Sequence, residues 1–271
     1  MVSYLPAGLQ EALEIRASTG AIPYGGGTDL MVNSDADASY LFLHKVPEMR
    51  RITVDEQNIR IGAACTFTET AESPLCPDIL KDAIAGVAAP AIRNLGTVGG
   101  NLGNGSAKAD CALIFFVTGA ELRLMSVRGE RFLSAKAFYL GQKKLALAPD
   151  ELIVEVLMPR AIPGRYYYRK VGAREALSIA RVSFAGLMDI RDGVVANCAT
   201  AFGAVSDVIL RREDIDAMLT GRTVAEAKAL KADYVRAYDA AIQPIRGRVS
   251  ADYRRAVCLN LLRDFLDTMG I

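Results

Sequence analysis

The glycine-rich stretch from Ile92 to Asp110 is the feature of this sequence that most constrains what the chain can fold into. Glycine occurs at five of its positions, among asparagine, threonine and serine residues. Glycine adopts turned backbone conformations and lacks the Cβ atom that would keep an anion away from backbone N–H groups. The stretch therefore predicts an irregular loop that binds a diphosphate, and it argues against an apolar core segment or a regular helix. A plain flexible loop is the alternative that this stretch leaves open.

A second glycine-rich stretch lies earlier in the chain, from Ala21 to Leu30. A short apolar strand leads there into three consecutive glycines and then into Thr28 and Asp29. Either of these two residues can cap a helix whose first N–H groups are free to bind an anion. Neither stretch matches the dinucleotide-binding fingerprint of a Rossmann crossover or the phosphate loop of P-loop proteins. Together they indicate a different nucleotide-binding fold.

Length and composition limit the class of protein. The chain has 271 residues, of which 51% are hydrophobic, so it can bury the core of one large or two modest domains. Its 32 basic and 31 acidic residues give no field that would attract nucleic acid or a membrane surface. The first residues lack the pattern of a secretory signal, and the longest apolar run, Ala112 to Val117, is too short to span a bilayer. We expect a cytoplasmic protein without nucleic-acid or membrane partners.

The cysteines and the single histidine offer no metal site or catalytic triad. The cysteines are scattered and odd in number, without a C-x-x-C pair, which favours buried core residues over disulfides, zinc or iron–sulfur ligands. They are Cys65, Cys76, Cys111, Cys198 and Cys258. His44 follows an apolar run and is expected at the end of a strand, so a Ser-His-Asp site cannot be assembled around it.

Hydrophobic periodicity and capping signals predict the elements of the first half. A helix is expected over residues 8–18, a buried strand over 40–43 and a hairpin over 52–61. The pair Thr66 and Glu69 forms a capping box for a helix that ends before Pro74, and another helix begins at Pro77. A short helix over 111–117 and strands over 121–127 and 152–157 complete this part.

The second half begins near Pro159 and Pro163, which bracket the best domain boundary. A strand through Tyr166–Tyr168 is expected to alternate between core and surface, and Asp192-Gly193 closes a hairpin of residues 182–190 and 194–201. The remaining residues are expected to be helical. The last helix, capped by Ser250, is expected to bury an apolar face, with Arg254 and Arg255 on a solvated face or at a subunit contact. The expected apolar face consists of Tyr253, Val257, Leu261, Phe265 and Met269.

The two glycine stretches together resemble the FAD-binding subunits of the molybdenum hydroxylases, a family that includes xanthine, carbon monoxide and nicotinate dehydrogenases. The resemblance is carried by G-G-T-D-L at Gly26–Leu30 and by T-V-G-G-N at Thr97–Asn101, followed by Asp110. Residues 150–159, 168–180 and 244–255 are also similar to segments of the family, so the likeness covers nearly the whole chain.

The resemblance implies an α+β fold in two domains. The first, residues 1–160, would be a two-subdomain FAD-binding domain of the vanillyl-alcohol-oxidase/MurB-like type, with subdomains of about 1–55 and 56–160. The second, residues 161–271, would be the smaller C-terminal domain of antiparallel sheet and helices.

The resemblance also implies an FAD site. Asp110 would bind ribityl or ribose hydroxyls, Ile153 would pack beside the flavin, and Lys170 would approach the isoalloxazine edge and influence the flavin potential. Position alone leaves open that Asp110 only stabilises a helix start and that Lys170 is a surface lysine in a salt bridge. The implied cofactor-binding residues are Pro23, Tyr24, Gly25, Gly26, Gly27, Thr28, Asp29, Leu30, Thr97, Gly99, Gly100, Asn101, Asn104, Asp110, Ile153 and Lys170.

The function implied is that of an FAD-dependent oxidoreductase subunit that carries electrons. It would take them from [2Fe–2S] clusters of one partner subunit, work with a subunit that holds the molybdenum cofactor, and pass them to NAD+ or another acceptor. A stand-alone FAD-dependent reductase of the same broad fold and a non-catalytic assembly or scaffold homologue are the alternatives. The chain departs from the family's frequent residues at Val87, at Gly105–Ala107 and at Ser178, which affects flavin shielding and the oxidant face. Substrate, acceptor and stoichiometry are not specified by the sequence.

Overall fold

The fold is described from a computed structural model that covers residues 2–35, 37–163, 165–174, 177–245 and 247–271. The chain forms two compact units. The first consists of Met1–Ser106 and Gly119–Arg160, and the second of Ala107–Thr118 and Ala161–Ile271. The segment of residues 107–118 therefore groups with the C-terminal part of the chain.

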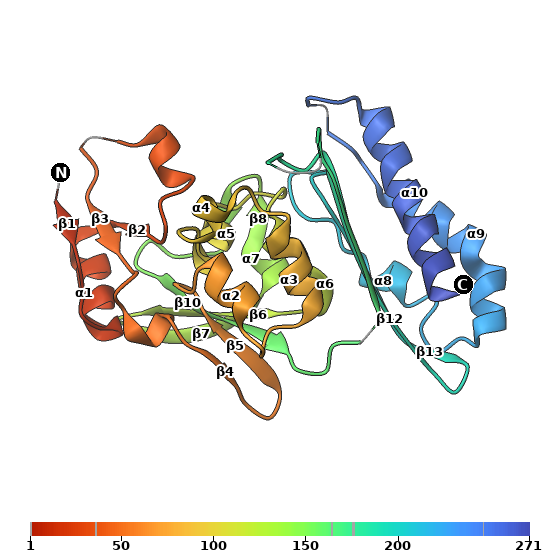
Figure 1. The fold of residues 1–271 in the computed structure, drawn as a ribbon, viewed down its shortest axis with the longest axis horizontal. Helices are drawn as coiled ribbons and strands as arrows, with labels where there is room; N and C mark the ends of the chain where they lie inside the picture. Colours follow the sequence, from red (N-terminus) through yellow and green to blue (C-terminus); the bar gives the residue numbers. More distant parts are fainter. Residues whose placement is uncertain (1, 36, 164, 175–176, 246) are drawn as a thin grey trace. The chain divides into compact units, whose positions relative to one another are not determined.

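The first unit begins with a small parallel sheet in the order β1-β3-β2 (Figure 1). Its elements in chain order are β1 (Ser3–Tyr4), α1 (Leu9–Thr19), β2 (Ile22–Tyr24), the 3-10 turn η1 (Leu30–Asn33) and β3 (Tyr40–Phe42). Helix α1 ends as predicted at Gly20, whose φ of 66° is left-handed. The expected helix start after the first glycine stretch is the short turn η1, and no side chain caps it.

An antiparallel sheet in the order β4-β5-β10-β6-β7 forms the rest of the first unit's strand framework. Its strands are β4 (Ile52–Val54), β5 (Asn58–Gly62), β10 (Leu152–Pro159), β6 (Glu121–Ser126) and β7 (Gly129–Ser134). The predicted hairpin and the two predicted strands are confirmed. The edge strand β7 was not predicted, because it is short and exposed and lacks the alternation of a half-buried strand. A turn of helix and a small hairpin follow it: α7 (Ala135–Phe138), β8 (Tyr139–Gly141) and β9 (Lys144–Leu145).

Short helices precede and include the central glycine stretch: α2 (Phe67–Glu72), α3 (Asp78–Ala85), α4 (Pro90–Arg93) and α5 (Val98–Gly103). The capping box of Thr66 and Glu69 is formed as predicted. The prediction that the central stretch contains no regular helix and no core segment is wrong, because α5 lies within it and buries Val98 and Leu102. The Thr97 side chain caps the N-terminus of α5, and the next two amides donate to the distant carbonyls of Cys65 and Ala63; these hydrogen bonds outweigh the poor helix propensity of glycine.

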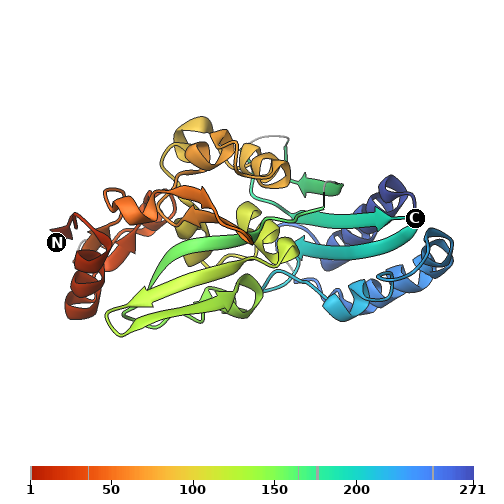
Figure 2. The same cartoon turned by 90° about the horizontal axis from the view of Figure 1, so that it is seen from below.

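The second unit is built on an antiparallel sheet in the order β11-β12-β13 (Figure 2). The strands are β11 (Tyr166–Val171), β12 (Val182–Arg191) and β13 (Val194–Gly203). The predicted hairpin turn is confirmed, with φ of 50° at Asp192 and 75° at Gly193, as a type I′ turn requires.

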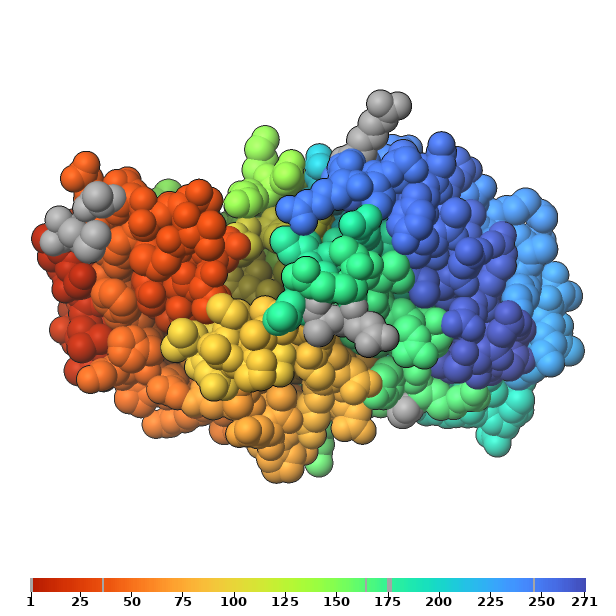
Figure 3. All heavy atoms as spheres, turned by 45° about the horizontal axis from the view of Figure 1, so that its top comes forward, coloured from red at the N-terminus to blue at the C-terminus, as the bar shows by residue number. Residues whose placement is uncertain are grey.

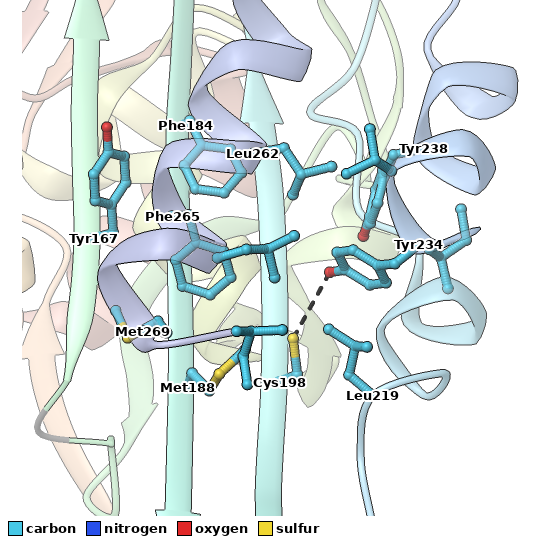
Figure 4. Close-up of a cluster of buried hydrophobic side chains, with 14 of the residues drawn as sticks. Tyr167, Phe184, Met188, Cys198, Leu219, Tyr234, Tyr238, Leu262, Phe265 and Met269 are labelled. Carbon is cyan, nitrogen blue, oxygen red and sulfur yellow. Dashed lines mark hydrogen bonds between the residues drawn. The ribbon is translucent and has the colours of Figure 1, made fainter. Parts of the chain in front are cut away.

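Helices cover both faces of this sheet (Figure 1). Helix α6 (Asp110–Thr118) packs on β12 and β13, while α10 (Ala251–Met269) and α9 (Val224–Ala241) cover the other face. The short helix α8 (Glu213–Asp216) joins α9. Tyr167 of β11 lies against Phe184 and Phe265 in the core on the α10 side, which confirms the expected alternation of core and surface (Figure 4).

Asp216 is a buried carboxylate where the same core meets α9. Its partners include Tyr234 and Tyr238, both labelled in Figure 4. The hydroxyls of Tyr234 and Tyr238 each donate to its Oδ1 at 2.8 Å, and the Thr200 N–H donates to its Oδ2 at 3.0 Å. Burial raises the pKa of this carboxyl, and the hydroxyl donors oppose the rise. Because its oxygens accept several hydrogen bonds, the carboxylate ties β13 to α8 and α9.

The predicted face of α10 is wrong in part. Its buried side chains include Phe265 and Met269 as expected, but Tyr253 is exposed, and Arg254 is buried with only 3% of its surface exposed. A strict i, i+4 series drifts around a helix of 3.6 residues per turn, so the expected row left the core at its first turn. Arg255, by contrast, is exposed as predicted and pairs with Asp239 at 2.6 Å.

The cysteines lie in the core as predicted, and all five are buried and free of disulfides. The described residues contain no grouping of three or more histidine, cysteine, aspartate or glutamate side chains that could hold a metal ion. None of the helices in the described ranges combines the length and the apolar character that a membrane crossing requires.

Candidate functional site

The two glycine stretches meet in the first unit. A Cβ atom at Gly26 would lie 1.7 Å from the carbonyl oxygen of Leu95, and one at Gly25 would lie 2.4 Å from Oγ1 of Thr97. These separations are far below van der Waals contact, so only glycine permits the approach. The φ of Gly27 is 69°, a left-handed value that also favours glycine. The first stretch therefore lies directly on the second.

The backbone N–H groups that follow β2 provide the clearest anion-binding feature. Among the described residues, the amides of Gly25 through Asp29 donate to no acceptor, although the segment is mostly half-buried. Buried backbone N–H groups normally donate a hydrogen bond to a protein acceptor or to water. A row of unpaired amides beside glycine residues without side chains is a suitable partner for a diphosphate.

The second stretch contributes shape rather than free donors. The first amides of α5 already donate within the chain, from Val98 to the Cys65 carbonyl at 3.0 Å and from Gly99 to the Ala63 carbonyl at 2.8 Å. The Gly100 amide donates to the Thr97 side chain at 3.0 Å. These bonds fix α5 against residues 63–65 and leave its N-terminus without a spare donor in its first turn.

Side chains around α5 add polar and apolar partners. Oδ1 of Asn101 is buried and has no hydrogen-bond partner among the described residues, so it can accept a bond from a ligand. Asn104 follows the last residue of α5, and the Ile153 side chain of β10 lies near Gly103, where an added Cβ would be 3.8 Å from Cδ1. The pairing of β10 with β6 shifts register between Ile153 and Glu155, an irregularity of the kind often found beside binding sites.

Asp110 and Lys170, the remaining predicted site residues, form an ion pair in the second unit. Lys170 Nζ donates to Asp110 Oδ2 at 2.6 Å, and the two side chains are only 14% and 8% exposed. Burial raises the pKa of the Asp110 carboxyl, while the Lys170 ammonium opposes the rise. The other oxygen, Oδ1, is buried without a hydrogen-bond partner in the described part of the chain.

Both alternatives considered for this pair hold in part. Asp110 is the first residue of α6, where a negative charge suits the helix dipole. Lys170 takes part in a salt bridge, but it is largely buried rather than at the surface. A paired carboxylate with one unsatisfied oxygen can still accept a hydrogen bond from a ligand hydroxyl, which an aspartate that only stabilises a helix start would not need to do.

Sequence reasoning missed the backbone partners that hold the site. The carbonyls of Ala63 and Cys65 come from a segment that the motifs did not include, and the carbonyl of Leu95 lies within the central glycine stretch, but carbonyl positions leave no residue-type signal. The buried position of Arg254 was also missed, although the row Arg254–Cys258–Leu262 carries a helical spacing that would place it inside.

Comparison with known proteins identifies the family to which the chain belongs. Residues 1–161 match the family described as FAD binding domain in molybdopterin dehydrogenase, and residues 166–269 match the CO dehydrogenase flavoprotein C-terminal domain. The putative xanthine dehydrogenase FAD-binding subunit XdhB of Escherichia coli (strain K12) is 32% identical over 197 residues, covering 69% of this chain and 67% of that protein. The nicotinate dehydrogenase FAD-subunit of Eubacterium barkeri is 28% identical over 286 residues, covering 98% and 96%.

Solved structures share the fold. Carbon monoxide dehydrogenase from Hydrogenophaga pseudoflava, in a form that lacks the Mo-pyranopterin moiety, contains a chain that aligns with a TM-score of 0.90 at 24% identity, over 98% of this chain and 96% of that chain. The matched domains and the fold define an FAD-binding protein with an antiparallel C-terminal domain, as the family resemblance implied. The chain belongs to the molybdenum hydroxylase family, as one of its FAD-binding oxidoreductase subunits.

Replacing Gly26 by alanine should destabilise the contact between the glycine stretches. The new Cβ would collide with backbone at Leu95, which cannot move aside as a side-chain tip can. We expect the free energy of unfolding to fall by about 3 kcal/mol, as for an overpacked site. Urea unfolding of the purified chain measures this. Gly103→Ala is the matched control, because its Cβ meets nothing closer than 3.8 Å and should leave stability unchanged or slightly higher.

Replacing Lys170 by methionine should raise the pKa of the Asp110 carboxyl further, because the ammonium is what lowers it against the effect of burial. Carbon-13 NMR of carboxyl-labelled aspartate, followed against pH, measures the change. Lys108→Met removes an exposed lysine two residues from Asp110 and should leave its titration unchanged. An Asp110 titration that stays in place in folded Lys170→Met would show that the ion pair does not control this carboxyl.

Proposed function

We propose that this chain is the FAD-carrying electron-transfer subunit of a molybdenum hydroxylase complex. Its role would be to receive electrons from [2Fe–2S] clusters of a partner subunit and to pass them to NAD+ or to another acceptor. Residues 1–160 would form the FAD-binding domain and residues 161–271 the C-terminal domain. A subunit that holds the molybdenum cofactor would oxidise the substrate and thereby determine which substrate the complex uses.

The single observation that carries the proposal is the row of unpaired amides from Gly25 to Asp29. A diphosphate has two negative groups that accept several N–H bonds, and the lack of side chains at Gly25–Gly27 lets its oxygens approach the backbone. The residues present therefore fit the dinucleotide that the family binds. In the first unit, Asn101 Oδ1 is buried without a described partner and supplies an acceptor for a hydroxyl group of this ligand. In the second unit, Asp110 Oδ1 is likewise buried without a described partner, and the family resemblance implies that it accepts from a ribityl or ribose hydroxyl.

Bound FAD would supply the electron-carrying chemistry, and the protein would supply position and charge. Ile153 would exclude water beside the flavin, since it is buried and apolar. The Lys170 ammonium would stabilise negative charge near the flavin edge and so raise the flavin potential. Its ion pair with Asp110 fixes the ammonium in place and partly offsets its charge.

The compartment and the other partners follow the same proposal. All five cysteines are free thiols, which suits the reducing cytoplasm. The nearly balanced charge of the chain gives no reason to expect nucleic acid or a membrane surface as a partner.

Introducing a negative charge beside the free amides should weaken FAD binding. We expect Thr28→Glu to raise the dissociation constant for FAD about 100-fold, equivalent to about 2.7 kcal/mol, because the carboxylate would repel the diphosphate. The measurement is titration of the apo-chain with FAD, followed by flavin absorbance after desalting. Thr53→Glu adds the same charge to an exposed position on β4 and should bind FAD normally. Equal affinity in all three proteins would refute the diphosphate site.

A tagged full-length chain should co-purify with its partners from the cells that make it. We expect one companion that carries the absorption of [2Fe–2S] clusters and one that releases molybdenum, in constant ratio to the chain. Metal analysis and mass spectrometry of the purified complex measure this. Purification of a flavin-loaded chain alone, active as a reductase, would instead favour a stand-alone enzyme.

A further inference from the structure

We propose that Arg254 is a positioning residue that holds the Asp110–Lys170 pair in place for the flavin. The effect of Arg254 on FAD rests on the proposed function, whereas the contacts of Arg254 that support its positioning role lie within the second unit alone. Neither residue of the pair touches Arg254 in the described contacts, so any influence must pass through the backbone segments that the arginine binds.

Arg254 is buried in the first turns of α10 and donates to main-chain carbonyls. Its Nη1 donates to the carbonyl of Arg181 at 2.5 Å and to the carbonyl of Ala204. A Cβ atom at Gly247 would lie 2.9 Å from Nη2, so the segment before α10 closes over the guanidinium. In Figure 3 the segment that follows β11 (blue-green) lies on the surface beside the segment that precedes α10 (blue). A buried guanidinium loses its hydration, and here the two carbonyls replace it at Nη1, while Nε is buried without a hydrogen-bond partner among the described residues.

The two carbonyls mark the end of the sheet that carries Lys170. Arg181 precedes β12, and its N–H donates to the Val171 carbonyl at 2.8 Å, while Ala204 follows β13. Ser183 lies two residues from Arg181, and Gly203 is the residue before Ala204; the strand register places Lys170 opposite Ser183, and Ser183 opposite Gly203. Because Arg254 binds the carbonyls of Arg181 and Ala204, it links the start of β12 to the end of β13. This link lies near the strand positions that are paired across the sheet with Lys170.

Ala204 connects the same arginine to Asp110. Its N–H donates to the carbonyl of Ala107 at 2.7 Å, three residues before Asp110, and its own carbonyl accepts from Arg254. The φ of Ala204 is 62°, a left-handed value that is sterically unfavourable for alanine. Hydrogen bonds on both sides of the residue hold this conformation. The start of α6 is therefore anchored to a strained residue that Arg254 stabilises.

An arginine suits this task better than a lysine. Both bonds come from Nη1, whose two N–H groups have fixed directions in the guanidinium plane, so they hold two carbonyls at a set separation, whereas an ammonium is a compact charge with rotatable donors on a flexible stem. Arg254→Lys therefore keeps the positive charge and most of the side-chain volume but relaxes the link between Arg181 and Ala204. We expect the fold to survive and the Asp110–Lys170 pair to open more often.

The first test needs no flavin. Lys170 is largely buried in its ion pair, so its acylation by a water-soluble reagent should be slow. In Arg254→Lys the acylation rate at Lys170, followed by peptide mass spectrometry, should rise about tenfold, equivalent to about 1.4 kcal/mol of lost protection. The matched control Arg255→Lys changes the neighbouring exposed arginine, which pairs with Asp239, and should leave the rate unchanged. An unchanged rate in a folded Arg254→Lys protein would overturn the proposal.

A gentler variant covers the case in which Arg254→Lys fails to fold. Gly247→Ala would place a Cβ 2.9 Å from Nη2, so the guanidinium must shift slightly while its charge remains. We expect a smaller increase in Lys170 acylation at an unchanged melting temperature. No increase in this folded variant would also count against a positioning role.

The second test uses FAD and separates positioning from general stability. Arg254→Lys should weaken FAD binding about tenfold in the otherwise unchanged chain but have little effect in a Lys170→Met background, because it acts through the pair. Equal effects in both backgrounds would mean that Arg254 serves only the fold. If the unchanged chain retains no FAD at all, the proposed function fails, and the acylation test alone decides the role of Arg254.

Discussion

The contact between Gly26 and the Leu95 carbonyl is the constraint on which the first unit's site depends. The main chain at Leu95 occupies the volume that a side chain at position 26 would need, so the two stretches can be in contact only with glycine at this position. This contact fixes the position of the backbone that carries the free amides of Gly25–Asp29. The carbonyls of Ala63 and Cys65 fix α5 in the same way. Main-chain contacts thus hold the site, and they do not use the amides of Gly25–Asp29, which remain free to donate to a ligand.

Much of the fold could be predicted, because its signals are local. The Thr66–Glu69 capping box, the Asp192-Gly193 turn and the Gly20 helix end each specify a conformation through the chemistry of a few adjacent residues. The resemblance of the glycine motifs then supplied the family and the fold class, which local signals cannot provide. The assignment of individual residues to the FAD site remains a prediction.

The features that escaped prediction depend on distant partners. Helix α5 forms in a sequence poor in helix formers, because carbonyls more than thirty positions away accept its first amides. Arg254 is a charged residue that sequence reasoning places in solvent, yet it is buried where two strand-end carbonyls replace its hydration. In both cases the deciding groups are backbone atoms, which have the same chemistry at every residue and leave no trace in composition. For Arg254 the available signal is its helical spacing with Cys258 and Leu262.

Helix α6 also gives the chain an unusual connectivity. The segment of residues 107–118 belongs to the second unit, although residues of the first unit flank it on both sides in the sequence. Its buried apolar side chains are synthesised before β12 and β13, against which they pack. The second unit therefore is not one contiguous segment of the sequence. During synthesis, α6 leaves the ribosome before the strands β12 and β13 that it packs against. A cut near residue 160 would separate α6 from β12 and β13, so neither piece would keep the packing between this helix and its sheet.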